Sequence, residues 1–240
     1  MTSTALLTGA SRGLGLALAT ALDARGWHLV VDGRDAGRLT AAVAALPRPD
    51  LVTAIPGDVA DPGHRAALAA ALPDRLDLLV NNAGDLGPSP LPPLAQLRIE
   101  DLQAVLAVNT LAPLALLQLA LPALARADGR VLNISSDAAV EAYEGWGGYG
   151  ASKAALDSLS AVLAVENPRL RIYAVDPGDM NTAMHQAAFP GEDITDRPAP
   201  ETVVPALLRL VEDDLPSGRY RAADLATGLA TGGAPVGADR

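Results

Sequence analysis

The chain has 240 residues and a formal net charge of −10; half of its residues are hydrophobic and only 3% are aromatic. This length is typical of one domain with a large, here aliphatic, core. The negative charge and the lack of a basic run argue against a nucleic-acid partner, because binding phosphates needs clustered Lys and Arg. Without Cys there can be no disulfide, thiolate nucleophile or Cys-ligated zinc. The three His have no ligand spacing, so we expect no metal site.

The first residues lack the positive region of a signal peptide and run directly into a Gly-rich motif. Residues 102–125 carry no charge and are long enough to cross a bilayer. That segment also contains Asn109 and Pro113, and charged residues adjoin both of its ends. We therefore expect a buried helix between a sheet and a neighbouring subunit, no membrane partner, and a cytoplasmic protein.

A short apolar strand, 4–7, is followed at once by T-G-A-S-R-G-L-G (8–15) and a helical run, 16–25. The missing side chains of Gly9, Gly13 and Gly15 let a pyrophosphate approach the N–H groups at the helix N-terminus. The sequence therefore predicts a dinucleotide site at the first strand–helix junction.

The second strand, 28–31, leads into D-G-R-D (32–35). In a βαβ nucleotide unit the end of this strand meets the adenosine ribose. We expect Gly33 and Arg34 to lie there, while Asp32, by strand alternation, points the other way. Arg12 and Arg34 could together bind a 2′-phosphate, which favours NADP(H) over NAD(H). The alternative is that both arginines are solvated surface residues.

The remaining elements alternate between strand and helix, which predicts an α/β protein with a Rossmann-like, doubly wound parallel sheet in a three-layer α/β/α arrangement. We expect one domain, 1–230, and a flexible tail, 231–240. The elements expected after the second strand are helix 36–46, strand 51–55, helix 65–72, strand 76–80, the long helix, strand 130–134, a helix from Tyr149, strand 170–175, helix 202–212 and a short strand in 217–222.

Ligand contacts are expected where these strands end. After the third strand Asp58 could accept from an adenine amino group with Val59 beside the ring; alternatively, Asp58 and Asp61 cap the next helix. After the fourth strand, N-N-A-G (81–84) lets backbone approach a ligand in the crevice of the sheet.

Tyr149 and Lys153 are four residues apart in a helical segment, so both side chains should lie on one face. A neighbouring ammonium favours an ionised phenol, so we expect the pKa of Tyr149 to fall below its usual value of about 10. Such a Tyr would serve as a general acid/base near neutral pH.

In order and spacing, the motifs T-G-A-S-R-G-L-G, G-D-V, N-N-A-G, Asn109, S-S, Y-G-A-S-K and P-G-D-M-N-T resemble those of the short-chain dehydrogenase/reductase family over nearly the whole chain. The resemblance implies that Tyr149 transfers the proton, that Lys153 lowers its pKa and holds the nicotinamide ribose, and that Ser136 polarises the carbonyl. Asn109 would kink its helix, free a backbone carbonyl and hold a water. The implied cofactor-binding residues are Gly9, Ser11, Arg12, Gly13, Leu14, Gly15, Arg34, Asp58, Val59, Asn82, Ala83, Gly84, Tyr149, Lys153, Pro177, Gly178 and Thr182.

The resemblance implies an NADP(H)-dependent oxidoreductase acting on a ketone, an aldehyde or a secondary alcohol, assembled as a homodimer or homotetramer. Two alternatives are a non-catalytic nucleotide-binding regulator or scaffold, and an epimerase or dehydratase. Loops 87–93 and 137–148 and a mobile lid in 180–199 would select the substrate. Trp146 would either contact the substrate or only close its loop. The compact segment V-E-N-P-R-L-R-I suggests that the helix carrying Tyr149 ends early.

Overall fold

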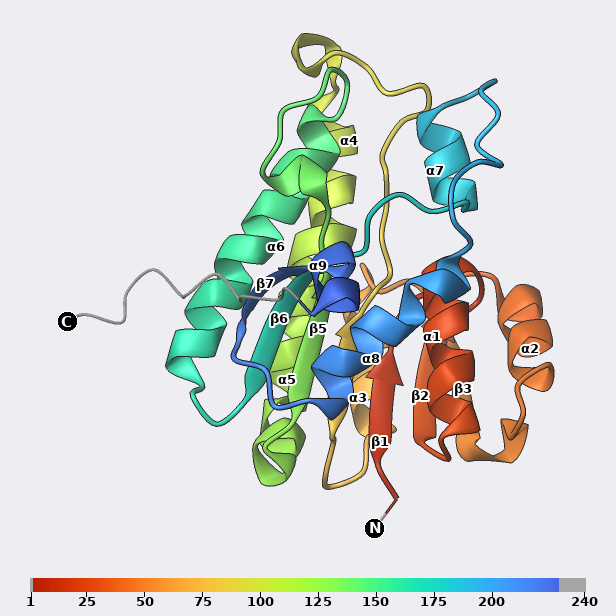
Figure 1. Ribbon diagram of the computed structural model, residues 1–240, viewed down its shortest axis with the longest axis vertical. Helices are drawn as coiled ribbons and strands as arrows, with labels where there is room; N and C mark the ends of the chain where they lie inside the picture. Colours follow the sequence, from red (N-terminus) through yellow and green to blue (C-terminus); the bar gives the residue numbers. More distant parts are fainter. Residues whose placement is uncertain (1, 229–240) are drawn as a thin grey trace.

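The computed structural model describes residues 2–228, so the tail expected at 231–240 lies outside the described residues. Across this part of the chain the strands form a seven-stranded sheet in the order β3-β2-β1-β4-β5-β6-β7, and every pairing is parallel (Figure 1). The order reverses between β1 and β4, the place where open α/β sheets bind ligands. The predicted doubly wound sheet is confirmed. The strands are β1 (Thr4–Leu7), β2 (His28–Gly33), β3 (Val52–Pro56), β4 (Leu78–Asn81), β5 (Arg130–Ile134), β6 (Arg171–Asp176) and β7 (Gly218–Arg221).

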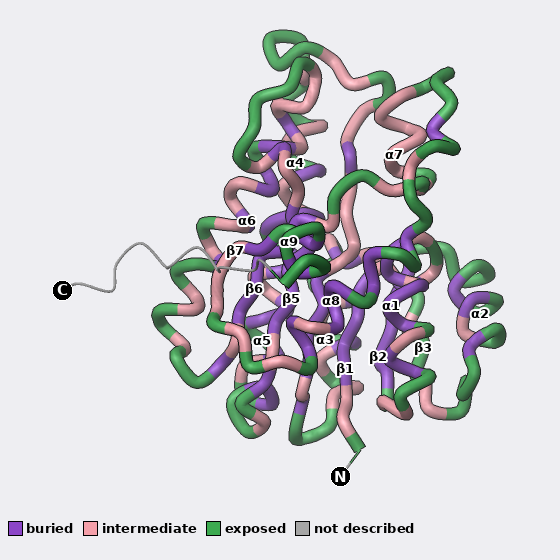
Figure 2. The backbone as a smooth tube through the Cα atoms, viewed as in Figure 1, coloured by how far each residue is buried: buried purple, intermediate pink, exposed green. Residues whose placement is uncertain are grey.

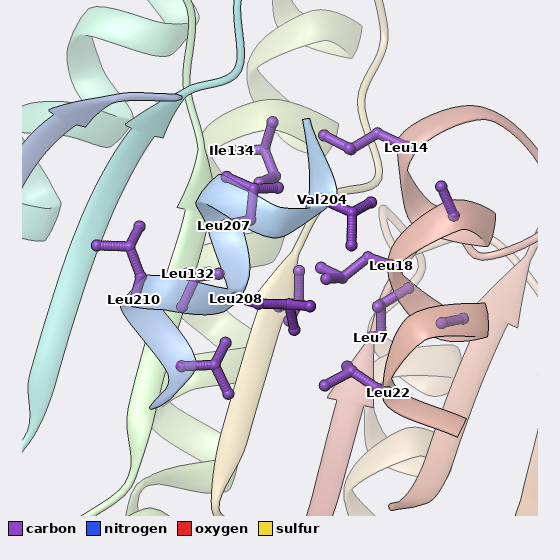
Figure 3. Packing of buried hydrophobic residues seen from close by; sticks show 14 of the residues in the cluster. Leu7, Leu14, Leu18, Leu22, Leu132, Ile134, Val204, Leu207, Leu208 and Leu210 are labelled. Atoms are coloured by element: carbon purple, nitrogen blue, oxygen red, sulfur yellow. The ribbon is translucent and has the colours of Figure 1, made fainter. Parts of the chain in front are cut away.

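Helices cover both faces of the sheet, as parallel strands require. The helices are α1 (Gly13–Ala24), α2 (Ala36–Ala44), α3 (Pro62–Ala70), α4 (Ile99–Leu106), α5 (Ala112–Ala127), α6 (Gly147–Glu166), α7 (Ala183–Ala188), α8 (Val204–Glu212) and α9 (Ala222–Thr227). Alternate strand residues supply two separate cores: Leu7 packs with α1 and α8, whereas Leu6 packs with α3 and α5. Figure 2 shows β1, β2, β4, β5 and β6 as mostly buried, whereas the edge strand β3 is largely exposed. Figure 3 shows leucines of α8 beside leucines of α1, in one cluster with Leu7 of β1 and with Leu132 and Ile134 of β5.

The long apolar helix runs from Ile99 to Ala127, and it is long and apolar enough to cross a membrane. Half of its most apolar window is buried inside the protein, and α5 packs against the sheet. At Ala107–Leu111 the helix widens into a π-helical turn that contains Asn109. The helix is therefore irregular at Asn109, where the family resemblance implied a kink.

Three features differ from the expectations. The Tyr149 helix does not end early: α6 runs through 20 residues to Glu166 and stops before Pro168, which has no N–H to continue it. The segment expected to be irregular contains α7, whose first turn is capped by the Thr182 hydroxyl, 3.2 Å from the His185 N–H. Helix α9 was not expected; it follows β7 directly and buries Leu225 in the core.

Candidate active site

The Gly-rich turn after β1 has the backbone geometry that the sequence predicted. Gly9 and Gly13 have φ of +71° and +55°, in the left-handed region that favours glycine. A Cβ on Gly15 would lie 2.2 Å from the Gly9 carbonyl oxygen, so only glycine fits there. Helix α1 begins with no capping side chain and no acidic residue in its first turn. Its free N–H groups and positive dipole therefore suit a phosphate.

Thr8 and Asn82 hold this turn in place. The Thr8 hydroxyl accepts hydrogen bonds from the N–H groups of Asn82 and Ala83, both at 3.0 Å. The Asn82 amide nitrogen donates to the Thr8 and Gly9 carbonyls at 2.9 and 3.2 Å. Asn82 was predicted as a cofactor contact, and its side chain supports the turn from beside it. The role of Thr8 was missed, because one Thr next to a Gly carries no signal of its own.

The side chain of Asp32, next to the end of β2, points to the Gly-rich turn, in agreement with the direction that strand alternation predicted. Its carboxylate is buried, accepts the Gly9 N–H at 2.6 Å and lies 3.1 Å from Nε2 of the buried His64. Burial raises the pKa of Asp32, an effect that the Gly9 and His64 hydrogen bonds partly offset. The Asp32–His64 pair thus supports the Gly-rich turn, and Gly33 and Arg34 line the cavity beside Asp32.

The capping interpretation holds for Asp61, and the adenine contact of Asp58 stays a prediction. Asp61 caps α3 by accepting the Gly63 N–H at 2.9 Å. Asp58 accepts the Ala60 N–H at 2.8 Å and also lines the main cavity together with Val59. Asp58 is therefore a turn residue that faces the cavity.

A cavity of about 1050 Å³ runs along the carboxyl ends of the strands. Among the predicted site residues only Asn109 is absent from its lining, and Arg38 is an addition that the sequence did not suggest. Its wall holds the Gly-rich turn, arginines at one end and a phenol at the other, so the residues fit a nicotinamide dinucleotide. The predicted residues that line it are Gly9, Ser11, Arg12, Gly13, Leu14, Gly15, Arg34, Asp58, Val59, Asn82, Ala83, Gly84, Ser136, Tyr149, Lys153, Pro177, Gly178 and Thr182.

Tyr149 and Lys153 lie on the same face of α6, as their spacing predicted, with Nζ 5.5 Å from the centre of the phenol ring. The predicted fall in the Tyr149 pKa is wrong for this structure. Burial raises the pKa of Tyr149, and the carboxylates of Asp176 and Asp137 raise it further. Burial also lowers the pKa of Lys153 to about 8, and its Nζ donates to the Ile134 carbonyl at 2.7 Å.

Asn109 does not line the cavity but holds its wall. Its side-chain amide accepts the Asp85 N–H and donates to the Asp85 carbonyl, both at 2.8 Å, and also donates to the Ser152 hydroxyl at 2.9 Å. Asn109 thus joins the turn after β4 to helix α6, next to Lys153. Ser152 was missed, although it stands within the Y-G-A-S-K motif.

The Ser136 hydroxyl donates to Asp137 Oδ1 at 2.9 Å, a contact that sequence reasoning missed. The Ser136 carbonyl accepts from Arg219 Nη2 at 2.9 Å, and Arg219 Nε donates to Asp157 Oδ2 at 2.9 Å. Arg219 therefore connects the end of β5 with α6 through β7. No motif marked Arg219, because its partners are distant in the sequence.

Aromatic side chains border Tyr149. Trp146 lies edge-on to Tyr149 with ring centres 5.7 Å apart, and its centre is 6.0 Å from that of Phe189 in the segment after α7. Both Trp146 and Phe189 line the cavity. The loop 87–93 meets helix α7, within the expected lid 180–199, since the Ser89 hydroxyl donates to the Ala187 carbonyl at 2.7 Å. The three predicted substrate loops therefore converge here.

Comparisons with known proteins agree with this geometry. The family described as "short chain dehydrogenase" matches residues 3–193. Serine 3-dehydrogenase of Agrobacterium fabrum is 36% identical over 188 residues, which cover 76% of this chain and 74% of that protein. A putative short chain dehydrogenase from Pseudomonas syringae superposes with a TM-score of 0.85 at 32% identity, covering 92% and 94% of the two chains.

A short chain dehydrogenase from Escherichia coli CFT073, solved in complex with NADPH, superposes with a TM-score of 0.84 at 30% identity over 92% of this chain and 96% of that one. The match to the family spans most of the chain, and the cavity holds the motifs of that family. This protein belongs to the short-chain dehydrogenase family of oxidoreductases.

Proposed function

We propose that this protein is an NADP(H)-dependent oxidoreductase that interconverts a ketone or aldehyde and the corresponding alcohol, with Tyr149 as general acid/base. The observation that carries the proposal is the shared cavity: Ser136, Tyr149 and Lys153 line the same space as the Gly-rich turn and Arg34. When bound, the cofactor supplies the hydride acceptor or donor. Proton transfer, substrate binding and cofactor positioning are carried out by the protein's own side chains.

Tyr149 is the proton donor in this proposal. The raised pKa keeps the phenol protonated at neutral pH, the form that gives a proton to a carbonyl oxygen, which supports the reductive direction. Lys153 holds the ribose hydroxyls and is fixed by the Ile134 carbonyl. Ser136 donates to the substrate oxygen, and Asn109 keeps the wall beside Lys153 in place through Asp85 and Ser152. Gly178, Pro177 and Thr182 seat the nicotinamide.

Selection of NADP(H) is supported by the charges at the other end of the cavity. Arg12, Arg34 and Arg38 line it there, and their side chains are exposed and available to a 2′-phosphate. Asp32, the acidic side chain nearest the end of β2, is hydrogen-bonded to Gly9 and lies against His64. The related structure that contains NADPH is consistent with this choice.

We also propose that the protein forms a homodimer or homotetramer and acts in the cytoplasm as a single domain, 1–230. Apolar side chains are exposed on the outer surface of the long helix and of α6, including Leu111, Leu119, Val162 and Val165. Large exposed apolar groups on neighbouring helices suit a subunit interface. Light scattering after size exclusion tests the assembly: a monomer at micromolar concentration would contradict it.

The first experiment follows the loss of NADPH absorbance with a panel of ketones, aldehydes and quinones, comparing wild type with Tyr149→Phe. Removing a general acid costs about 10²- to 10⁴-fold in rate, so the variant should bind NADPH and lose most turnover. Near-wild-type turnover by Tyr149→Phe would discard the proton-transfer role. Wild-type silence with tight NADPH binding would favour a regulator, and substrate conversion without net NADPH loss would favour an epimerase.

A further inference from the structure

The Ser136 hydroxyl has one proton, and in this structure it points to Asp137. The Oγ–Oδ1 distance is 2.9 Å, and the Ala138 N–H also reaches Oδ1 at 2.8 Å. To polarise a substrate carbonyl, Ser136 has to turn its proton away from this carboxylate. A carboxylate that loses a donor is left short of hydrogen bonds, and this is costly in a partly buried site. A substrate with no donor of its own leaves Asp137 in that state.

The second oxygen of Asp137 is also short of donors. Oδ2 lies 3.0 Å from the Tyr143 hydroxyl, but the same hydroxyl lies 2.7 Å from Glu141 Oε2. A phenol has a single proton, so Asp137 and Glu141 compete for it, and the shorter distance favours Glu141. No Lys, Arg or His among residues 2–228 lies within 4.0 Å of the Asp137 carboxylate.

The basic side chains that line the cavity either have partners or belong to its other end. Lys153 donates to the Ile134 carbonyl, and His185 faces Asp179 at 3.8 Å. The arginines of the lining come from the Gly-rich turn and from the segment after β2. The space next to Tyr149 is therefore bordered by carboxylates, with Asp137 the one in direct contact with Ser136. An anionic substrate group would be repelled there.

We propose that Asp137 is a specificity-determining residue and that the substrate carries a protonated amine on the carbon next to its carbonyl, as in an α-amino ketone or the corresponding 1,2-amino alcohol. The inference rests on the proposed oxidoreductase function. A small N–C–C=O torsion in the amino ketone, or the gauche rotamer in the amino alcohol, brings nitrogen and oxygen to about hydrogen-bonding separation. The oxygen can then take the Ser136 proton while the ammonium replaces that proton at Asp137.

The reaction remains that of the proposed function, and its balance is simple. The carbonyl carbon gains a hydride from the nicotinamide and the carbonyl oxygen gains the Tyr149 proton, so an amino ketone and NADPH with one solvent proton give an amino alcohol and NADP⁺. The amine takes no part in bond making. Trp146 and Phe189 offer their rings to the apolar part of the substrate and to the cation itself.

The test compares two ketones of the same size. Aminoacetone and 2-butanone differ in an ammonium replacing a methyl group, and NADPH consumption gives kcat/KM for each. We expect wild type to prefer aminoacetone by about tenfold or more, the range of a charge-assisted hydrogen bond. Asp137→Asn keeps the size of the side chain and should lose this preference, measured as the ratio of the two kcat/KM values. Glu144→Gln, an exposed neighbour, is the matched control and should keep the preference.

A binding measurement covers the case in which turnover is slow. Calorimetric titration of 1-amino-2-propanol and 2-butanol into the protein with NADPH should show tighter binding of the amine to wild type but not to Asp137→Asn. Equal affinity of wild type for the two alcohols, together with equal or lower kcat/KM for aminoacetone, overturns the amine proposal. If neutral ketones are still turned over in that case, the proposed oxidoreductase function stands. Absence of turnover across the whole carbonyl panel would instead overturn the oxidoreductase function itself.

Discussion

The two ends of the cavity are built by different means. The end formed by β1, β2 and α1 offers main-chain N–H groups, glycines without side chains and exposed arginines. The end formed by β5, β6 and α6 offers buried or half-buried ionisable side chains in fixed hydrogen bonds, such as Lys153 on Ile134 and Asp176 on the Gly178 N–H. A long anionic ligand needs room and diffuse positive potential, whereas proton transfer needs a few groups held in one geometry. Added side-chain bulk should therefore disrupt the first end, whereas a change in charge should disrupt the second.

The largest effect is expected from Gly15→Ala at the first end. The new Cβ would lie 2.2 Å from the Gly9 carbonyl oxygen, and backbone cannot give way cheaply there. We expect a loss of about 3 kcal/mol or more in the free energy of unfolding and no measurable cofactor binding. Thermal unfolding and NADPH fluorescence titration measure both.

Gly63→Ala is the matched control for this substitution, because its Cβ would meet only the Asp61 side chain at 3.4 Å in exposed helix α3. It should change neither quantity by much. Wild-type cofactor affinity in Gly15→Ala would show that the turn has space to spare and would break the steric half of the comparison.

At the second end the test is the titration of Lys153, the single lysine of the sequence. Burial lowers its pKa to about 8 from 10.5, so the ammonium costs stability below pH 8, and this cost disappears as the pH rises to 10.5. Stability of wild type relative to Lys153→Met should therefore rise by up to about 3 kcal/mol across that window.

With ¹³C-labelled lysine the protein gives one side-chain Cε signal, which reads the same pKa directly by NMR. The signal should titrate near pH 8 in the folded protein and near 10.5 in urea. An unshifted midpoint in the folded protein would mean that the ammonium is well solvated, and the electrostatic half of the comparison would fail.

The smallest effect is expected from Arg34→Ala. Arg34 is exposed, so its interaction with a 2′-phosphate is screened, and a loss of about tenfold in NADPH affinity is the scale expected for one charge-assisted contact. NADH affinity should hardly change. Arg169→Ala, which removes an exposed arginine paired with Asp128 far along the chain, is the control. Equal losses for both cofactors would refute a role in reading the phosphate.

Motif spacing predicted much of the site because many of the site residues are close in the sequence or lie at a fixed interval along one helix or strand. The Gly-rich turn, the Tyr149–Lys153 pair and the direction of Asp32 all follow from helix and strand periodicity. The boundary errors have local causes too. Pro168 ends α6 later than the compact sequence suggested, and α9 is short enough to leave no periodic signal.

What spacing could not predict depends on contacts between distant segments. His64 under Asp32, Arg219 on the Ser136 carbonyl and the placement of Phe189 beside Trp146 join residues that are far apart in the sequence. The pKa of Tyr149 belongs with them. Helical spacing placed an ammonium nearby. The pKa, however, depends on burial and on the carboxylates of Asp176, at the end of β6, and Asp137, which follows β5.

By itself the sequence determined the order of the seven strands, the Gly-rich turn and the residues proposed for catalysis, since these depend on neighbours within a few turns. The tertiary structure alone decided the charge balance around Tyr149. Electrostatic energies depend on distance in space and on exclusion of water, and both are set only when β5, β6 and α6 pack together.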